Sequence, residues 1–118
     1  MEVMEFTKFE FNDGLNITVR RGDKWHIFEH PEDGVLKSVD MSDKSSKCGV
    51  VRYCKFFKSI SMSFDKIPNE LLTLYHDQFC RGRIDHLFSI MKDIYPEFKI
   101  DEKVTIVFFI PDEEDDYD

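Results

Sequence analysis

The sequence predicts one α+β domain, a small curved sheet or β-barrel with two helices between the penultimate and the last strand. Three observations support this prediction. Short runs that alternate or are rich in β-branched and aromatic residues, bounded by turn residues, fill the first 60 positions and are typical of strands. Two segments with helical features follow them. Residues 104–110 then form a last apolar run, which returns the chain to the sheet.

Turn residues separate the predicted strands. Residues 6–11 alternate and predict a first strand, which ends at the turn Asn12-Asp13-Gly14. Asn16 to Arg21 is the second strand, and Gly22-Asp23 ends it. The other expected elements are a short extended piece at Trp25 to Phe28, a turn at 30–34, a strand at Val35 to Met41, a polar loop at 42–47, the strongest strand signal at Gly49 to Ser59, and an apolar, central strand at Val104 to Ile110.

Two helices are expected between the last two strands. Pro68 suits the first turn of a helix that continues through Tyr75. The second helix is predicted by apolar residues at the i, i+3, i+4, i+7 spacing, and Pro96 ends it. These apolar residues are Ile84, Leu87, Phe88, Met91 and Ile94, while Asp85, Lys92 and Asp93 are expected to face outward.

Charge is concentrated at one end of the chain. The 118 residues carry a formal net charge of −8, and six of the 24 acidic residues lie within 111–118. The rest holds 18 acidic and 16 basic residues, so its net charge is only −2. We therefore predict a domain at 1–110 and an acidic, flexible tail at 111–118. Strong non-specific DNA binding is disfavoured, because it needs a basic surface, but a local basic pocket is compatible with this charge.

Composition also points to a compartment. The first five residues are acidic and include no long apolar stretch, unlike a secretory signal, and no apolar run approaches the roughly 20 residues that span a bilayer. The three cysteines are odd in number and form no CxxC pair, which fits a reducing cytoplasm. His26 and His30 are four apart, but Pro31 argues against a helix there, so we expect no metal and no cofactor.

The second predicted strand carries the candidate site. Thr18 and Arg20 are two apart and project from one face, where a hydroxyl and a guanidinium can hold a planar polar ligand or a phosphate. Arg21 and Lys24 either widen a positive rim or are ordinary charges at a strand end. Trp25 either stacks on a base or anchors a small core.

Three segments together carry a family resemblance: the threonine-x-arginine strand at 17–20, the stretch from His76 through a helix to Tyr95-Pro96, and the strand at 104–109. With them the chain resembles the ASCH domain, a branch of the PUA-like β-barrel superfamily, over most of residues 6–110. The resemblance implies a cleft beside Thr18 and Arg20 that recognises RNA, a nucleotide or a modified nucleoside.

One bacterial ASCH subgroup is an amidohydrolase that deacylates acetylated cytidine. It uses a lysine three residues before the strand threonine, the threonine itself, and a glutamate four residues after the histidine. Here these positions are Leu15, Thr18 and Cys80. Because leucine cannot transfer a proton, we expect a binding module without catalysis. The alternative is an enzyme on acylated cytidine with an altered residue set, in which Cys80 is either a nucleophile near His76 or a small buried hydrophobe.

The acidic tail suggests a third function. Residues 111–118 either aid solubility or mimic a polyanion that binds a protein partner, as in small inhibitor proteins of viruses, phages included. The sequence leaves the ligand and the oligomeric state open.

Overall fold

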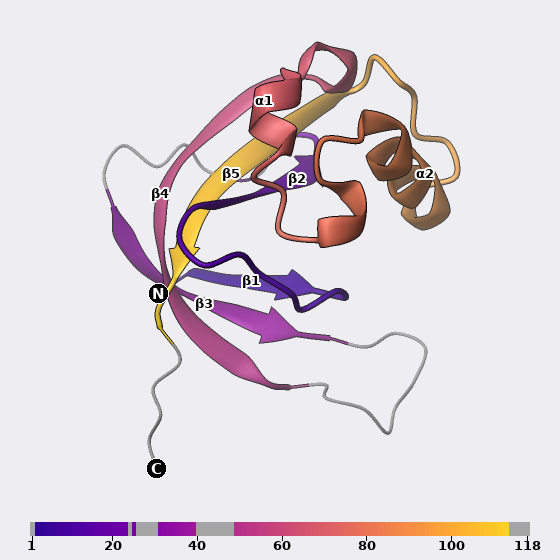
Figure 1. Cartoon of the computed structure of the whole chain (residues 1–118). Coiled ribbons are helices and arrows are strands. Elements are labelled where there is room, and N and C mark those ends of the chain that lie inside the picture. The colour runs from indigo at the N-terminus through magenta and orange to yellow at the C-terminus, as the bar shows by residue number, and fades with distance from the viewer. Residues whose placement is uncertain (1, 24, 26–30, 40–48, 114–118) are drawn as a thin grey trace.

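The computed structural model describes residues 2–23, 25, 31–39 and 49–113. Five strands form one mixed sheet that curls into a half-barrel, with two helices to one side (Figure 1). This confirms the α+β class and the two helices before the last strand. The elements are β1 (Glu2–Phe6), β2 (Asn16–Arg21), β3 (Glu32–Ser38), β4 (Val51–Ser63), α1 (Asn69–Leu72), α2 (Ile84–Ile94) and β5 (Lys103–Pro111), with single 3₁₀ turns η1 (Phe64–Lys66) and η2 (Gln78–Cys80).

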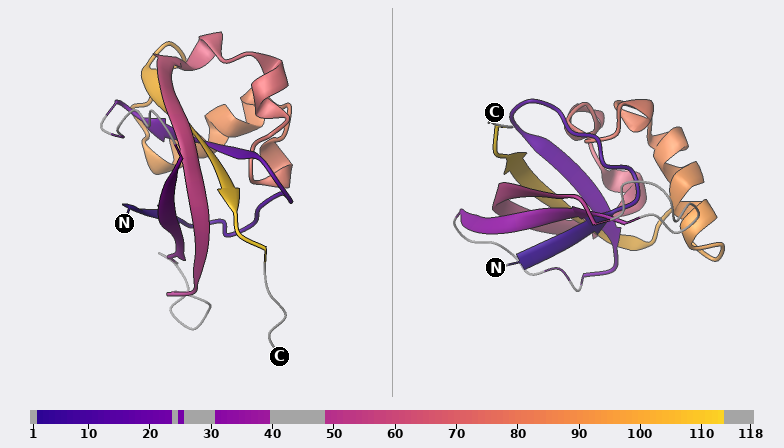
Figure 2. Two further views of the ribbon diagram at one scale, coloured as in Figure 1. Left: turned by 90° about the vertical axis from the view of Figure 1, so that its left-hand side faces the viewer. Right: turned by 90° about the horizontal axis from the view of Figure 1, so that it is seen from below.

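The strand order is β1-β3-β4-β5-β2, so β1 and β2 are the two edges. β1 pairs with β3 in parallel, and the other pairs are antiparallel. The long strands β4 and β5 form the bent middle of the half-barrel (Figure 2), with a bulge between Phe56 and Lys58. β5 is flanked by strands on both sides and residues 104–109 are buried, which confirms the prediction of a central strand.

Two apolar cores lie on opposite faces of β5. Ile106 and Phe108 belong to the helix-side core, and Val107 and Phe109 to the strand-side core, as the alternation of a strand requires. Both helices contribute to the helix-side core. That core comprises Ile17, Val19, Phe64, Ile67, Leu72, Tyr75, Cys80, Leu87, Met91, Phe98, Val104, Ile106 and Phe108, and the strand-side core comprises Met4, Phe6, Leu36, Cys54, Phe56, Val107 and Phe109.

Local signals placed β2 and α2 at their observed bounds. Asp85, Lys92 and Asp93 are exposed on α2, as predicted, while Leu87 and Met91 are buried. α1 is shorter than predicted, because the chain after Leu72 leaves the helix and forms a parallel bridge from Tyr75 to Ile17. Pro68 stands just before the helix as its N-cap. No helix within the described residues is long and apolar enough to cross a membrane.

The predicted first strand at 6–11 is wrong, because the observed strand ends at Phe6. Phe9 and Phe11, which follow the strand, are partly buried and pack in a cluster of rings with Phe6. The ring centroids of Phe6 and Phe11 lie 5.2 Å apart, and those of Phe9 and Phe11 lie 4.9 Å apart, both edge to face. Rings in such a cluster gain their contacts without a strand.

The predicted turn at 30–34 is also wrong from Glu32 onward, since β3 begins there and not at Val35. Gly34 suggested a turn, but it lies within β3, where a Cβ would overlap the Phe56 ring. The glycine therefore permits close packing. The expected strand at 49–59 is observed as β4, which begins two residues later, at Val51, and ends four residues later, at Ser63. Residues 26–30 and 40–48, which include the expected polar loop, lie outside the described residues.

Candidate ligand-binding cavity

A cavity of about 640 Å³ lies at the seam, the gap between the edge strands β1 and β2. Its walls come from the end of β1 with the residues after it, the second half of β2, residues 75–79 and one face of α2. Edge strands of an open sheet leave backbone groups without a neighbouring strand, so such a gap has both polar and apolar surfaces.

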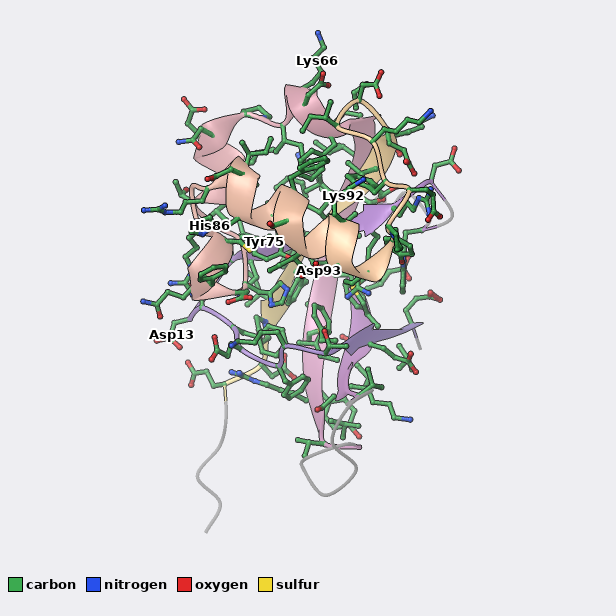
Figure 3. The ribbon with its side chains drawn as sticks, turned by 90° about the vertical axis from the view of Figure 1, so that its right-hand side faces the viewer. Asp13, Lys66, Tyr75, His86, Lys92 and Asp93 are labelled. Atoms are coloured by element: carbon green, nitrogen blue, oxygen red, sulfur yellow. The ribbon has the colours of Figure 1, made fainter. Side chains whose placement is uncertain are left out.

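The backbone of residues 74–76 pairs with β2, and this pairing brings the polar side chains of residues 75–77 close to that strand. The Ile17 N–H donates to the Leu74 carbonyl at 2.9 Å, and the His76 N–H donates to the Ile17 carbonyl at 3.1 Å. These bonds place Tyr75, His76 and Asp77 at the cavity beside Thr18, although nearly half of the chain separates them in sequence. Figure 3 looks at the molecule from the α2 side and shows Tyr75 beneath that helix.

Arg20 crosses the seam. Its Nη2 donates to the Glu5 carbonyl on β1 at 2.8 Å, and its guanidinium carbon lies 4.7 Å from the centre of the Phe6 ring. Burial lowers the pKa of Arg20, but a guanidinium stays protonated at any ordinary pH. Its Nε is a buried nitrogen that has no hydrogen-bond partner among the described residues. Arg20 therefore supplies a positive charge to the cavity wall, and it also carries a buried donor without a partner.

His76 is a neutral donor and acceptor. The side chain is 4% exposed and lies between aromatic rings, with centroids 4.9 Å from Phe6 and 5.6 Å from Phe11. Burial lowers the pKa of His76 to about 4, so the imidazole is neutral at pH 7. Its Nδ1 lies 3.0 Å from the Glu10 carbonyl, which can only accept. Nδ1 is therefore the protonated nitrogen, and Nε2 is left as an acceptor.

Tyr75 and Asp77 add further polar groups. The buried Tyr75 side chain is hydrogen-bonded to the Thr18 side chain, and desolvation raises the pKa of its phenol. Asp77 is 6% exposed, and its Oδ1 accepts a hydrogen bond from the Phe79 N–H at 3.0 Å. The cavity thus combines hydroxyl, imidazole, carboxylate and guanidinium groups within one small volume.

Apolar groups form the rest of the wall and the rim. α2 contributes Ile90, Met91 and Ile94. Phe79 is 60% exposed at the rim, and its ring stacks on His86 with centroids 4.4 Å apart and planes 19° apart. Figure 3 labels His86 near the start of α2. One face of the Phe79 ring is covered by this contact, which leaves the other for a flat ligand.

The predicted site residues have different surroundings. Thr18 and Arg20 line the same cavity, and Arg21 also borders it. However, Arg21 is bonded to Glu102 and, at 3.0 Å, to Glu97. Trp25 packs against the strand-side core and is not among the residues that line the cavity. Lys24 lies outside the described residues.

The two positions that depart from the hydrolase pattern supply nothing to the cavity. Leu15 is 37% exposed and borders a separate apolar hollow with Phe57 and Phe108. Cys80 is fully buried in the helix-side core, and burial raises the pKa of its thiol to about 11. A thiol with this pKa is a poor nucleophile at neutral pH.

Sequence reasoning did not identify the contributions of Tyr75 and Asp77, and it used His76 as a landmark of the resemblance and as a neighbour of Cys80, not as part of a binding site. Three consecutive polar or titratable residues between two helices were the available signal, but nothing local predicts that they pair with β2. No group of three or more His, Cys, Asp or Glu side chains in the described ranges is arranged to hold a metal ion.

Comparison of the chain with protein-family models, curated proteins and solved structures gives no match. The likeness to the ASCH domain stays a prediction from the sequence. Function is therefore best inferred from the residues of the cavity.

Proposed function

We propose that this protein is a small binding module that recognises a nucleotide or a modified nucleoside, free or within an RNA, in the cavity beside Thr18 and Arg20. The main supporting observation is the buried Arg20 Nε without a partner at the wall of a cavity of about 640 Å³. A buried donor that is left unpaired costs roughly 1–3 kcal/mol, and more when it belongs to a charged group, so a ligand that accepts from it gains affinity.

The shape and chemistry of the cavity fit a nucleobase better than a plain apolar ligand. Ligand sites typically have volumes of roughly 300–1,000 Å³, mostly apolar walls and a few fixed polar groups. Here Phe6 and Ile90 supply apolar surface, while Thr18 and His76 supply neutral hydrogen-bonding groups. A base has apolar faces and a polar edge, which matches this division.

The charge distribution argues against a long polyanion as the ligand. The chain carries a net charge of −8, and the carboxylates of Glu97 and Glu102 neutralise Arg21. Arg20 is suited to one phosphate or one carbonyl, not to a phosphate backbone. Phe79 at the rim is placed to stack one neighbouring base, which would admit a nucleoside within a short single strand.

No observation favours the amidohydrolase alternative, because Leu15 and Cys80 do not border the cavity. Interaction of the acidic tail with a protein partner also stays a prediction. Of the tail, only residues 111–113 are described, and residues 114–118 lie outside the described part of the chain.

The test compares two adjacent arginines. Calorimetric titration with the four common ribonucleosides, their monophosphates and N4-acetylcytidine is repeated on the parent protein, Arg20→Gln and Arg21→Gln. Loss of charged hydrogen bonds in Arg20→Gln should weaken binding roughly tenfold to a hundredfold. Arg21→Gln is the matched control and should stay within about twofold, since Arg21 is already bonded to Glu97 and Glu102.

Equal affinities for the parent and Arg20→Gln would contradict the proposal, as would the absence of binding by every compound. Circular dichroism and amide spectra establish that each variant is folded. Should Arg20→Gln unfold, Arg20→Lys keeps the charge but lacks Nε and the planar fork, and it should still bind more weakly than the parent.

A further inference from the structure

We infer that the edge of β2 without a strand partner binds the ligand: the backbone N–H and C=O of Val19 pair with a neighbouring acceptor and donor on the edge of a nucleobase. This inference rests on the proposed function and specifies how a base would be recognised. It assigns recognition of the base to backbone groups, a role that side-chain patterns in the sequence do not reveal.

The direction of the Val19 backbone follows from its neighbours. The N–H and C=O of Ile17 bond to residues 74 and 76, so they point away from β5. Even-numbered residues have the opposite direction: the Gly22 N–H, just after β2, points toward β5 and donates to the Lys103 carbonyl at 2.9 Å. Backbone groups of alternate strand residues point to the same side. Val19 therefore directs its N–H and C=O away from β5, as Ile17 does.

Val19 is one of the residues that line the cavity. The residue as a whole is 5% exposed, and its side chain packs in the helix-side core. Residues 74–76 cover the edge of β2 only as far as Ile17. Within the described ranges, no hydrogen bond joins the Val19 N–H or C=O to a group on this side. Buried backbone groups nearly always have partners, so this pair suits a ligand.

The geometry selects the class of ligand. The N–H and C=O of one extended residue point the same way and bond as a pair to a facing group, as in an antiparallel ladder. The complement is an acceptor beside a donor, which cytosine offers at N3 and N4 and adenine offers at N1 and N6. Arg20, the next residue, lines the same cavity and has a buried Nε without a partner. A flat hydrocarbon or a bare phosphate offers no such pair.

An extended peptide added to the edge would use the same groups, but the structure favours a base. The free edge of β2 beyond Ile17 has only two outward residues, Val19 and Arg21. Side chains of α2, including Ile90 and Ile94, line the cavity across from this edge. The space is therefore short along the strand and bounded across it, which suits a single ring system.

The experiment follows the Val19 amide directly. Protein labelled with ¹⁵N is titrated with cytidine and adenosine, and with their N4,N4-dimethyl and N6,N6-dimethyl analogues, which keep the ring but lose the donor. With a binding nucleoside, the Val19 amide proton should move downfield and its hydrogen exchange should slow. The matched dimethyl analogue should bind roughly tenfold more weakly, because the Val19 carbonyl loses its donor.

The outcomes separate this inference from the proposed function. The inference is overturned, while the proposed function stands, if nucleosides bind and move the Arg20 Nε signal but leave the Val19 amide signal unchanged, and if the dimethyl analogues bind as tightly as the parent nucleosides. Absence of binding by all four compounds, together with the panel above, removes both. A tetra-alanine peptide that shifts the Val19 and Arg21 amides when nucleosides do not would instead assign the edge to strand addition.

Discussion

The two faces of β2 differ in what their side chains contact. Ile17 and Val19 point into the helix-side core and are almost fully buried. Thr18 and Arg20 point the other way and line the cavity. A strand of six residues thus divides its side chains between a packed face and a binding face, as its period of two allows.

The adjacent arginines Arg20 and Arg21 show how neighbouring groups decide whether a cation is available to a ligand. Arg21 forms ion pairs with Glu97 and Glu102, and its guanidinium lies 4.9 Å from the centre of the Tyr95 ring. Arg20 is bonded to one backbone carbonyl and keeps an unpaired Nε. Equal formal charge does not make an equal site, because the neighbouring carboxylates decide which cation is available to a ligand.

The largest expected contrast is in stability. Ile17→Ala should lower the free energy of unfolding by about 2–5 kcal/mol, because it leaves a cavity in a fully buried core. Thr18→Val, on the binding face, keeps the volume and loses one hydrogen bond with Tyr75, so about 1 kcal/mol is expected. Urea unfolding of both variants measures the difference. Equal losses would mean that the two faces are not distinct in packing.

A smaller effect is expected on the pH dependence of stability, through His76 at the cavity. The pKa of His76 is about 4 when folded, against an ordinary value of about 6.5, so between these values only the unfolded state takes up the proton. This contribution to stability is complete above about pH 6.5 and falls by up to about 1.4 kcal/mol per unit as the pH drops toward 4. In urea unfolding at about pH 7, 6 and 5, His76→Gln should show a shallower slope than the parent. Parallel slopes would contradict the neutral, buried imidazole.

The smallest expected effect is on thermal stability, and it comes from Arg21, the charged last residue on the packed face of β2. Arg21→Gln removes surface ion pairs, and such pairs contribute little and are screened by salt. The melting temperature should fall slightly at low ionic strength, and the difference should shrink toward zero at about 1 M salt. A loss that persists at high salt would show that Arg21 acts through packing on Tyr95.

Local signals explain which parts of the fold were predictable. β2 lies between two turns, and α2 has a regular apolar spacing, so both were predicted at their observed bounds. The strand expected at 6–11 failed because alternating phenylalanines also suit a cluster of rings. The turn expected around Gly34 failed because a strand glycine that meets a large side chain looks the same in sequence as a turn glycine.

The part of the site that could be predicted is the part in which alternation along one strand determines which side chains share a face. The shared face of Thr18 and Arg20 followed from that rule alone. The approach of Tyr75, His76 and Asp77 depends on backbone bonds to Ile17 from a distant segment, which no local pattern encodes. Likewise, the sequence left open whether Arg21 widens a positive rim or is an ordinary strand-end charge, because its partners Glu97 and Glu102 lie 76 and 81 residues further along the chain.

The contact between Gly34 and Phe56 constrains how related sequences can diverge. Any larger residue at position 34 would require a smaller side chain at position 56, because the phenylalanine ring occupies the space of the missing Cβ. Homologues should therefore change the two positions together, in compensating sizes. A glycine in the third strand matched to a phenylalanine in the fourth would serve as a search pattern for relatives whose overall similarity has been lost.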